Sequence, residues 1–370
     1  MFAKTSINGL ELANRFIRSA TWEGLAAPDG AVTPQLMERM VELTLGGVGL
    51  IISSHAYVAQ AGQATPWQLG ADKDALIPGL KQLTTAVHEH GGKIILQLAH
   101  AGNYAAEELT KQPAWVVSPS AEIGAGAAER QEITGFMIQD LIKAYTEAAA
   151  RAQQAGFDGL QLHAAHGYLL SQFLSPVFNQ RQDAYGGSIY NKTRIHRQIY
   201  QSIRAVVGVD FPIFIKMNCG DFVEQGLEVE ESILAAKLFA DAGFDALELS
   251  GGFIKTGKLS PSRPGITSQD KEAYYQKYAP KIKDNIDIPL ILVGGMRSFE
   301  VAERMVLQGA ADYISMSRPL IREPDLINRW KSGDRRKAEC VSDNLCFNPG
   351  FAGKGVYCVT KELESAIKDY

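Results

Sequence analysis

The segment AGFDGLQLHAAHGYLL at 155–170 contains the end of one structural unit and the start of the next. Ala155-Gly156 is typical of a helix end, and the apolar run at 159–163 predicts a buried strand directly after it. The polar segment HAAHGYLL at 163–170 follows this strand. A helix, a buried strand and a polar loop in this order are typical of a parallel sheet built from strand–helix units.

The same alternation repeats along the chain. Apolar residues between positions 138 and 152 recur at spacings of three and four, which predicts a helix with one buried face. Thr33-Pro34 predicts a helix start, and Ala242-Gly243 and Gln308-Gly309 predict helix ends just before strands. The predicted strands are eight apolar runs, at 16–20, 48–53, 93–98, 159–163, 213–217, 246–249, 290–293 and 313–316.

Eight strand–helix units match an α/β fold of the closed (β/α)8 TIM-barrel type. Such barrels run from about 200 to over 400 residues, and the chain has 370. A doubly wound open sheet is the alternative, but no glycine-rich dinucleotide fingerprint follows the first strand after Ala20. We therefore predict one barrel domain over residues 1–370, with residues from about 331 to 370 as a short C-terminal appendage packed on the barrel.

The composition excludes several classes of protein. With 46% hydrophobic and 21% charged residues, the chain has enough apolar material for a large core. Its net charge of −4 comes from interspersed charges, so there is no basic stripe for nucleic acid. The sequence contains neither an 18-residue apolar run nor the pattern of a signal peptide, so we expect no membrane association and a cytoplasmic location.

In a β/α barrel the functional site lies at the carboxyl ends of the strands. Ser54 and His55 follow the second predicted strand, and Gln97 lies within the third. Gly294-Gly295 and Ser317-Arg318 follow the last two strands, where barrels commonly bind a phosphate through backbone N–H groups. Tight turns alone would explain the glycines, whereas Arg318 favours a phosphate site because a guanidinium adds charge-assisted hydrogen bonds.

His163, His166 and Tyr168 lie within six residues at the end of the fourth strand. Two imidazoles could hold a substrate oxygen on which negative charge develops, and a phenol with a pKa near 10 can donate a proton. Structural hydrogen bonds are the alternative for each histidine. A metal site is disfavoured, because the spacing differs from the two-histidine zinc motif and the loop has no acidic third ligand. We therefore predict no metal.

Lys216 lies within an apolar strand run, where an unpaired ammonium would be costly to bury. The residue therefore needs an anionic partner. Two roles remain open: a Schiff-base lysine of an aldolase-type barrel, or a fixed positive charge beside a cofactor ring that becomes anionic on reduction.

Several blocks of the sequence, from about Asn14 to Cys358, resemble the Old Yellow Enzyme family of NADH:flavin oxidoreductases. Their order and spacing carry the resemblance. The blocks are NRFIRSAT at 14–21, GGVGLII at 46–52, QLAHAG at 97–102, HAAHGYLLSQFLSP at 163–176, NQRQDAYGGS at 179–188, ELSGG at 248–252, LVGG at 292–295 and SRPLIREP at 317–324.

The resemblance implies FMN as cofactor and assigns residues to its ring. Ser19, Ala20 and Thr21 would border the isoalloxazine, with the Thr21 hydroxyl near O4 and N5. Gln97 would hydrogen-bond the pyrimidine edge, and Lys216 would lie at N1 and O2 and stabilise the reduced anionic flavin.

The resemblance also implies a phosphate site and a reaction. The phosphate would lie on Gly295, Ser317 and Arg318, with Gly294 beside them. NADH or NADPH would reduce FMN and leave. N5 would then pass hydride to the β-carbon of a small α,β-unsaturated substrate held by His163 and His166, while Tyr168 protonates the α-carbon. Many relatives self-associate, so a homo-oligomer is compatible with this interpretation.

Three departures from the family pattern carry information. Many relatives have arginine in place of Lys216, so a bidentate clamp becomes a point charge. His55 stands where a small residue is usual. We assign it to the cofactor site, and the alternative is a structural role in its loop. Asp343 stands where larger relatives have one of four cysteines that bind an iron–sulfur cluster.

The cysteines and two competing functions complete the predictions. Cys219 stands alone, and Cys340, Cys346 and Cys358 near the C-terminus form no disulfide framework. We expect no iron–sulfur cluster and no appended dinucleotide-binding domains, and leave a weak metal site at these cysteines open. The competing functions are a cofactor-free lyase with Lys216 as Schiff-base residue and a non-catalytic electron carrier.

Overall fold

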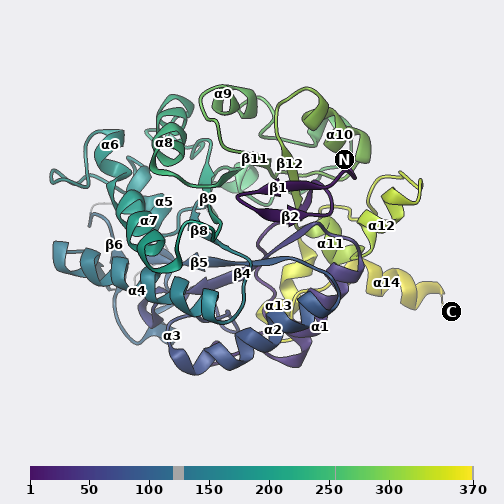
Figure 1. Cartoon of the computed structure of the whole chain (residues 1–370), viewed down its shortest axis with the longest axis horizontal. Coiled ribbons are helices and arrows are strands. Elements are labelled where there is room, and N and C mark those ends of the chain that lie inside the picture. Colours follow the sequence, from purple (N-terminus) through teal and green to yellow (C-terminus); the bar gives the residue numbers. More distant parts are fainter. Residues whose placement is uncertain (120–128, 255, 369–370) are drawn as a thin grey trace.

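Eight parallel strands form a closed barrel in the computed structural model, which describes residues 1–119, 129–254 and 256–368 (Figure 1). The strands are β3 Phe16–Arg18, β4 Leu50–Tyr57, β5 Ile94–Ala99, β8 Leu160–Ala164, β9 Ile213–Asn218, β10 Ala246–Ser250, β11 Leu290–Leu292 and β12 Tyr313–Met316. The order of the strands around the barrel is β10-β11-β12-β3-β4-β5-β8-β9. The last barrel strand in the sequence, β12, pairs with the first, β3, and this pairing closes the barrel.

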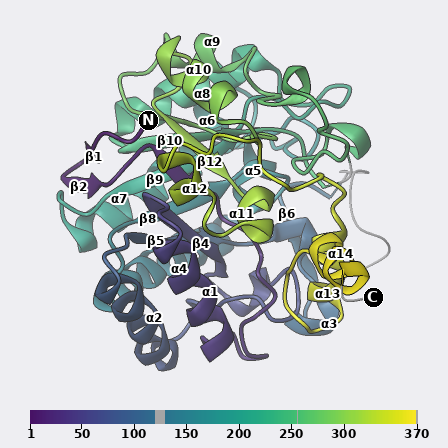
Figure 2. The same ribbon diagram turned by 90° about the vertical axis from the view of Figure 1, so that its right-hand side faces the viewer.

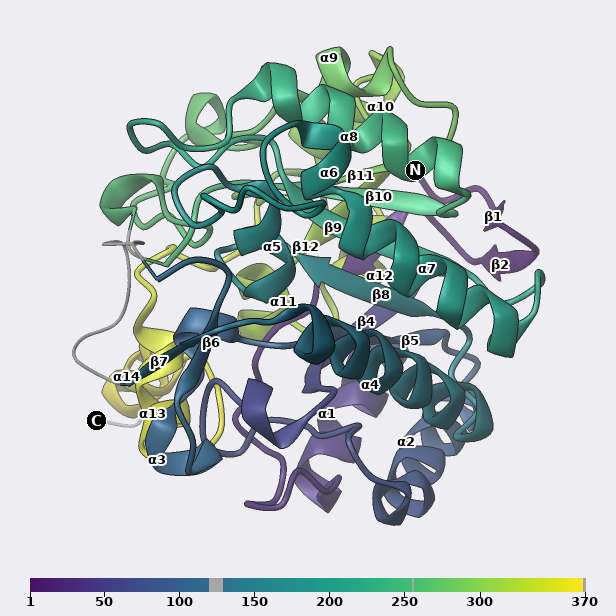
Figure 3. The ribbon, with the colours of Figure 1, turned by 90° about the vertical axis from the view of Figure 1, so that its left-hand side faces the viewer.

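One helix follows each barrel strand and packs on the outside (Figure 3). These helices are α1 Pro34–Leu45, α2 Ile77–Glu89, α4 Gly135–Gln154, α7 Arg194–Val207, α8 Val229–Ala242, α9 Ala279–Lys283, α10 Phe299–Leu307 and α12 Leu326–Lys331. The predicted TIM barrel is therefore confirmed.

Shorter elements extend the barrel at its ends. The strands are β1 Thr5–Ile7 and β2 Leu10–Leu12, which form an antiparallel hairpin, and the parallel pair β6 Ala114–Val116 and β7 Arg130–Glu132. The helices are α3 Glu107–Thr110, α5 Leu169–Leu174, α6 Ile189–Lys192, α11 Arg318–Arg322, α13 Asn348–Phe351 and α14 Val359–Lys368. Single 3₁₀ turns cover Gln60–Gly62, Asp74–Leu76, Gly102–Tyr104, Gly257–Leu259, Gln269–Lys271 and Leu345–Phe347.

Local sequence explains where the long helices begin and end. Thr33 caps α1, because its side-chain oxygen accepts a hydrogen bond from the Leu36 N–H at 3.2 Å. Helix α8 ends at Gly243, whose φ of +102° suits glycine better than any other residue. The buried face of α4 contains the predicted apolar positions, among them Ile138, Leu141 and Ala152.

The barrel interior is apolar at the amino ends of the strands. Side chains that alternate inward from the strands form one cluster there, including Ile17, Ile95 and Phe214. Ile7 and Leu12 of the β1–β2 hairpin join this cluster and close that end of the barrel. Figures 2 and 3 show the hairpin at one end of the molecule and α13, α14 and β6 at the other.

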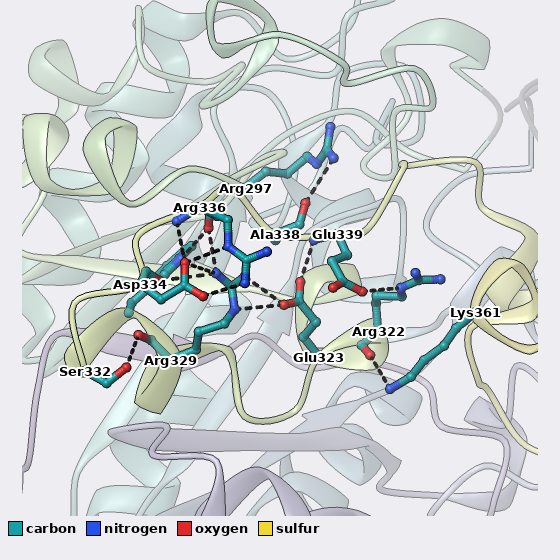
Figure 4. Close-up of polar contacts among 11 residues, drawn as sticks. Arg297, Arg322, Glu323, Arg329, Ser332, Asp334, Arg336, Ala338, Glu339 and Lys361 are labelled. Carbon is teal, nitrogen blue, oxygen red and sulfur yellow. Dashed lines mark hydrogen bonds and ion pairs between the residues drawn. The ribbon is translucent and has the colours of Figure 1, made fainter. Parts of the chain in front are cut away.

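Ion pairs fix the residues after α12 to the barrel (Figure 4). Arg322 of α11 contacts Glu339 at 3.2 Å and also pairs with Glu364 of α14. Arg329 of α12 pairs with Glu323 at 2.7 Å. The division of the chain into one barrel domain and an appendage from about residue 331 stays a prediction. No helix in the described ranges is both long and apolar enough to span a membrane.

Trp330 packs helix α12 against β3, the first strand of the barrel. We expect its replacement to lower the stability of the protein measurably. The ring is 1% exposed and lies 5.4 Å from the Phe16 ring and 5.8 Å from the Phe299 ring, centroid to centroid. Trp330→Ala should lower the free energy of unfolding by about 3–5 kcal/mol, because the cavity it leaves cannot fully collapse. Urea unfolding measures the change.

The control for Trp330→Ala is Val209→Ala, since Val209 is 74% exposed. This control should change the free energy of unfolding by no more than about 0.5 kcal/mol. Similar losses in both variants would contradict the assigned packing role of Trp330.

Candidate active site

A cavity of about 200 Å³ opens at the carboxyl ends of the barrel strands. Nine residues predicted from the sequence line it: Ser19, Ala20, Thr21, His166, Lys216, Gly294, Gly295, Ser317 and Arg318. The structure therefore brings the predicted ring-binding and phosphate-binding residues to one cavity.

One end of the cavity has the features of a phosphate site. Gly295 has a φ of +69°, and a Cβ there would lie 2.7 Å from the Tyr274 ring, so only glycine fits. Within the described residues, the backbone N–H groups of Gly295 and Arg318 have no acceptor. The buried Arg318 guanidinium lies at the same end and donates to Asn344 Oδ1 at 2.7 Å. Unpaired N–H groups beside a guanidinium suit a phosphate.

A buried ion pair forms the floor of the cavity. Lys216 Nζ lies 3.2 Å from Glu248 Oε1, and the two side chains are 3% and 0% exposed. Lys216 also donates to Ser19 Oγ at 2.8 Å, and Ser19 Oγ donates to Glu248 at 2.7 Å. Burial raises the pKa of Glu248, but the charge of Lys216 and the hydrogen bonds to the carboxylate outweigh this and lower it overall. Lys216 thus has the anionic partner that its sequence position requires.

Hydrogen bonds continue from Glu248 across the barrel. Gln161 Nε2 donates to Glu248 Oε2 at 3.0 Å, and Gln97 Nε2 donates to Gln161 Oε1 at 2.6 Å. Ser315 Oγ donates to Glu248 Oε1 at 2.7 Å. Gln97 is therefore positioned by the same network as Lys216, although it is not among the residues that line the cavity.

His163, His166 and Tyr168 meet beside the cavity. The His163 ring lies 5.2 Å from the His166 ring and 4.7 Å from the Tyr168 ring, centroid to centroid. His166 has a φ of +64°, which is uncommon for a residue other than glycine, and its N–H donates to Asn218 Oδ1 at 3.1 Å. His166 lines the cavity, so it connects the cluster to it.

The two histidines have ring nitrogens available for a ligand. His166 Nε2 hydrogen-bonds Ser250 Oγ at 2.7 Å, and its Nδ1 has no partner among the described residues. The His163 ring makes no hydrogen bond within the described part of the chain, and its Nδ1 is buried without a partner. Burial, together with neighbouring charges that include Lys216, lowers the pKa of both histidines well below 6.5. Both rings are therefore neutral at neutral pH.

His55 lies within β4 and not in the loop after the strand, so the predicted strand end at position 53 was wrong. A β-bulge between Ile52 and His55 lengthens the strand and interrupts the apolar pattern from which its end was predicted. His55 Nε2 lies 3.2 Å from the Tyr168 hydroxyl oxygen, and His55 does not line the cavity. Its assignment to the cofactor site stays a prediction.

The tail cysteines Cys340, Cys346 and Cys358 lie near one another, because burial raises the pKa of Cys340 and of Cys346 and the Cys358 thiol adds to both shifts. Within the described ranges no group of three or more His, Cys, Asp or Glu side chains could hold a metal ion. Cys346 packs in an apolar cluster with Trp22, and Cys358 Sγ accepts a hydrogen bond from Arg322 at 3.7 Å. The expected absence of an iron–sulfur cluster stays a prediction, based on Asp343 in place of a fourth cysteine.

Sequence reasoning missed three residues of the site. Glu248 could have been predicted from the sequence, because it is an acidic residue between Leu247 and Leu249 in a buried strand and could therefore pair with Lys216. Tyr274, which forms one wall beside Gly295, and Asn344, which holds Arg318, lie in irregular segments with no motif to indicate them.

The chain belongs to the NADH:flavin oxidoreductase / NADH oxidase family, whose model matches residues 1–337. This is the Old Yellow Enzyme family, which uses flavin and NADH or NADPH. The chain is 34% identical over 349 residues to an NADH oxidase of Thermoanaerobacter brockii, covering 93% of this chain and 53% of that protein. It therefore spans about half the length of that relative.

Two further comparisons cover nearly the whole length of the matched protein. The chain is 34% identical over 326 residues to an NADPH dehydrogenase of Bacillus subtilis, covering 88% of this chain and 92% of that protein. The solved structure of an old yellow enzyme homologue from Zymomonas mobilis has a TM-score of 0.77 and 27% identity, covering 90% of this chain and 92% of that one.

Because His100 is buried, we expect the free energy of unfolding to fall in acid. Burial lowers the pKa of His100 to about 3 from its ordinary value of 6.5. Between these values the unfolded chain binds a proton that the folded chain does not, so stability falls as the pH falls below 6.5.

The free energy of unfolding of wild type should fall between pH 6.5 and about pH 4.5, and in His100→Gln this fall should be smaller by about 2 kcal/mol. Urea unfolding at each pH measures the free energies, and parallel pH profiles for the two proteins would contradict the prediction. Only the pH dependence is compared, because the substitution also changes packing against Trp115, whose ring centroid lies 5.0 Å away.

Proposed function

We propose that the chain is an FMN-dependent NAD(P)H oxidoreductase that reduces activated alkenes such as enones. One observation carries the proposal: two neutral histidines and a phenol meet beside a cavity that has a buried lysine in its lining and, at one end, unpaired backbone N–H groups next to a guanidinium. Bound FMN would supply the hydride, which it takes from NADH or NADPH.

Residues within or shortly after five barrel strands would hold FMN. Gly295, Ser317 and Arg318 would bind the phosphate, as their free N–H groups and the guanidinium allow. Lys216 would place its charge at the pyrimidine side of the ring, and Gln97 would hydrogen-bond the pyrimidine edge. Thr21 is held close to the ring site by its hydrogen bond to Ser317 Oγ at 2.7 Å.

His163 and His166 would bind the carbonyl oxygen of the alkene substrate. In the neutral form each imidazole donates one hydrogen bond, and both together favour the negative charge that develops on this oxygen. Tyr168 would then protonate the α-carbon. Burial raises the pKa of Tyr168 above 10.0, so its hydroxyl stays protonated until the substrate requires the proton.

Tyr168→Phe tests the proton donor. Reoxidation of the NADPH-reduced protein by 2-cyclohexenone should slow by about 10²- to 10⁴-fold, the usual contribution of a general acid, while reduction by NADPH changes little. Stopped-flow absorbance at the flavin bands measures both half-reactions. Tyr313→Phe is the matched control, because its hydroxyl bonds Thr5 at the opposite end of the barrel. Unchanged enone reduction in Tyr168→Phe would contradict the role of Tyr168 as proton donor.

Arg318→Gln tests the cofactor. It should weaken FMN binding by about 10- to 100-fold, since a charged hydrogen bond contributes about 1.5–3 kcal/mol. Riboflavin lacks the phosphate, so its affinity should be similar for wild type and variant. Fluorescence titration of the apoprotein with each flavin measures the ratio, and an equal loss for both flavins would contradict the phosphate assignment.

A cofactor-free lyase with a Schiff base on Lys216 is the competing function. The contacts of Lys216 with Ser19 and Glu248 support a fixed cation instead, because both hold its ammonium in the barrel wall. A colourless protein in which borohydride and a carbonyl substrate label Lys216 would overturn the FMN proposal.

A further inference from the structure

A β-bulge in β4 turns His55 toward the barrel interior. Ile52 pairs with Ile95 of β5, but the next inward pair joins His55 to Gln97, so β4 carries one extra residue. Without that residue, Ser54 would pair with Gln97 and His55 would point to the outside of the barrel. The bulge therefore decides that an imidazole, and not a serine hydroxyl, faces the site.

Inside the barrel, His55 lies against Tyr168. Its Nε2 is 3.2 Å from the phenolic oxygen, and the ring centroids are 5.4 Å apart at 70°. Both residues are 8% exposed. Within the described residues, His55 is the hydrogen-bonding partner of the Tyr168 hydroxyl. Gln68 Nε2 donates to the His55 carbonyl at 3.3 Å and helps to fix the bulged strand.

The buried phenol needs such a partner if it is to release a proton. Burial raises the pKa of Tyr168, so the phenolate left by proton transfer is unfavourable in this environment. Burial and the charge of Lys216 lower the pKa of His55 to about 4, so its ring is neutral and carries one N–H. An N–H on Nε2 points at the phenolic oxygen and leaves the proton of Tyr168 free to face the substrate.

We infer that His55 is a positioning residue for Tyr168, whose phenolic oxygen accepts a hydrogen bond from His55 Nε2–H before and after proton transfer. This inference rests on the proposed function. When Tyr168 acts, its O–H bond breaks, the electron pair stays on oxygen, and the proton forms the new C–H bond at the α-carbon. His55 stabilises the resulting phenolate until it regains a proton from water.

The experiment follows reoxidation of the NADPH-reduced holoenzyme by 2-cyclohexenone. His55→Ala should slow this step by about 10²-fold, the effect of losing one donor to a developing oxyanion. His55→Gln should keep most of the rate, because its amide nitrogen reaches the position of Nε2. The shorter His55→Asn should not. Reoxidation by ferricyanide requires no proton transfer to carbon and should keep the wild-type rate in every variant.

A double-mutant cycle separates the inference from the proposed function. In a Tyr168→Phe background, His55→Ala should have no further effect on enone reduction, because its partner is already lost. Equal effects in both backgrounds, or full enone activity in His55→Ala, would overturn the inference and leave Tyr168 as the proton donor. Full activity in Tyr168→Phe alone would overturn both. If His55→Ala fails to retain flavin, the rates of His55→Gln and His55→Asn test the inference instead, and equal rates in these two variants would overturn it.

Discussion

The ion pair between Lys216 and Glu248 is the contact on which the rest of the site depends. An isolated charge in the barrel interior would be costly, and here the two charges lie 3.2 Å apart with almost no exposure. The carboxylate also accepts hydrogen bonds from Ser19, Gln161 and Ser315. These partners come from β8 and β12 and from the residue after β3, so one buried carboxylate fixes several strands where the apolar interior ends and the cavity begins.

Stability alone does not explain this arrangement. A well-packed apolar set can replace a buried ion pair with equal or greater stability. What an apolar set cannot supply is a fixed positive charge at the cavity floor. That charge also acts on the neighbouring histidines: together with burial, it lowers the pKa of His55, His163 and His166 and keeps the rings neutral. Lys216 thus adds to the effect of burial in keeping the nearby histidines neutral.

The sequence was sufficient for the barrel and for nine of the residues that line the cavity. Buried parallel strands are short apolar runs, and the carboxyl end of each run points to one face, so Lys216, Gly295 and Arg318 could be placed together. The position of His55 could not be predicted, because the bulge reverses the alternation of β4 and the polar residues there indicate the end of a strand. Tyr274 and Asn344 come from irregular segments, whose approach depends on the whole fold.

Burial imposes opposite demands on the two kinds of group in this cluster. It keeps His163 and His166 neutral, so that each ring carries one N–H donor and one acceptor nitrogen. The same burial raises the pKa of Tyr168 and makes it a weaker acid. Opening the site to water would restore the acidity of the phenol but would weaken every hydrogen bond to the substrate. A single donor at the phenolic oxygen avoids this conflict, because it stabilises the phenolate locally and leaves the rest of the cluster dry. The contact between Tyr168 and His55 has the geometry that this solution requires.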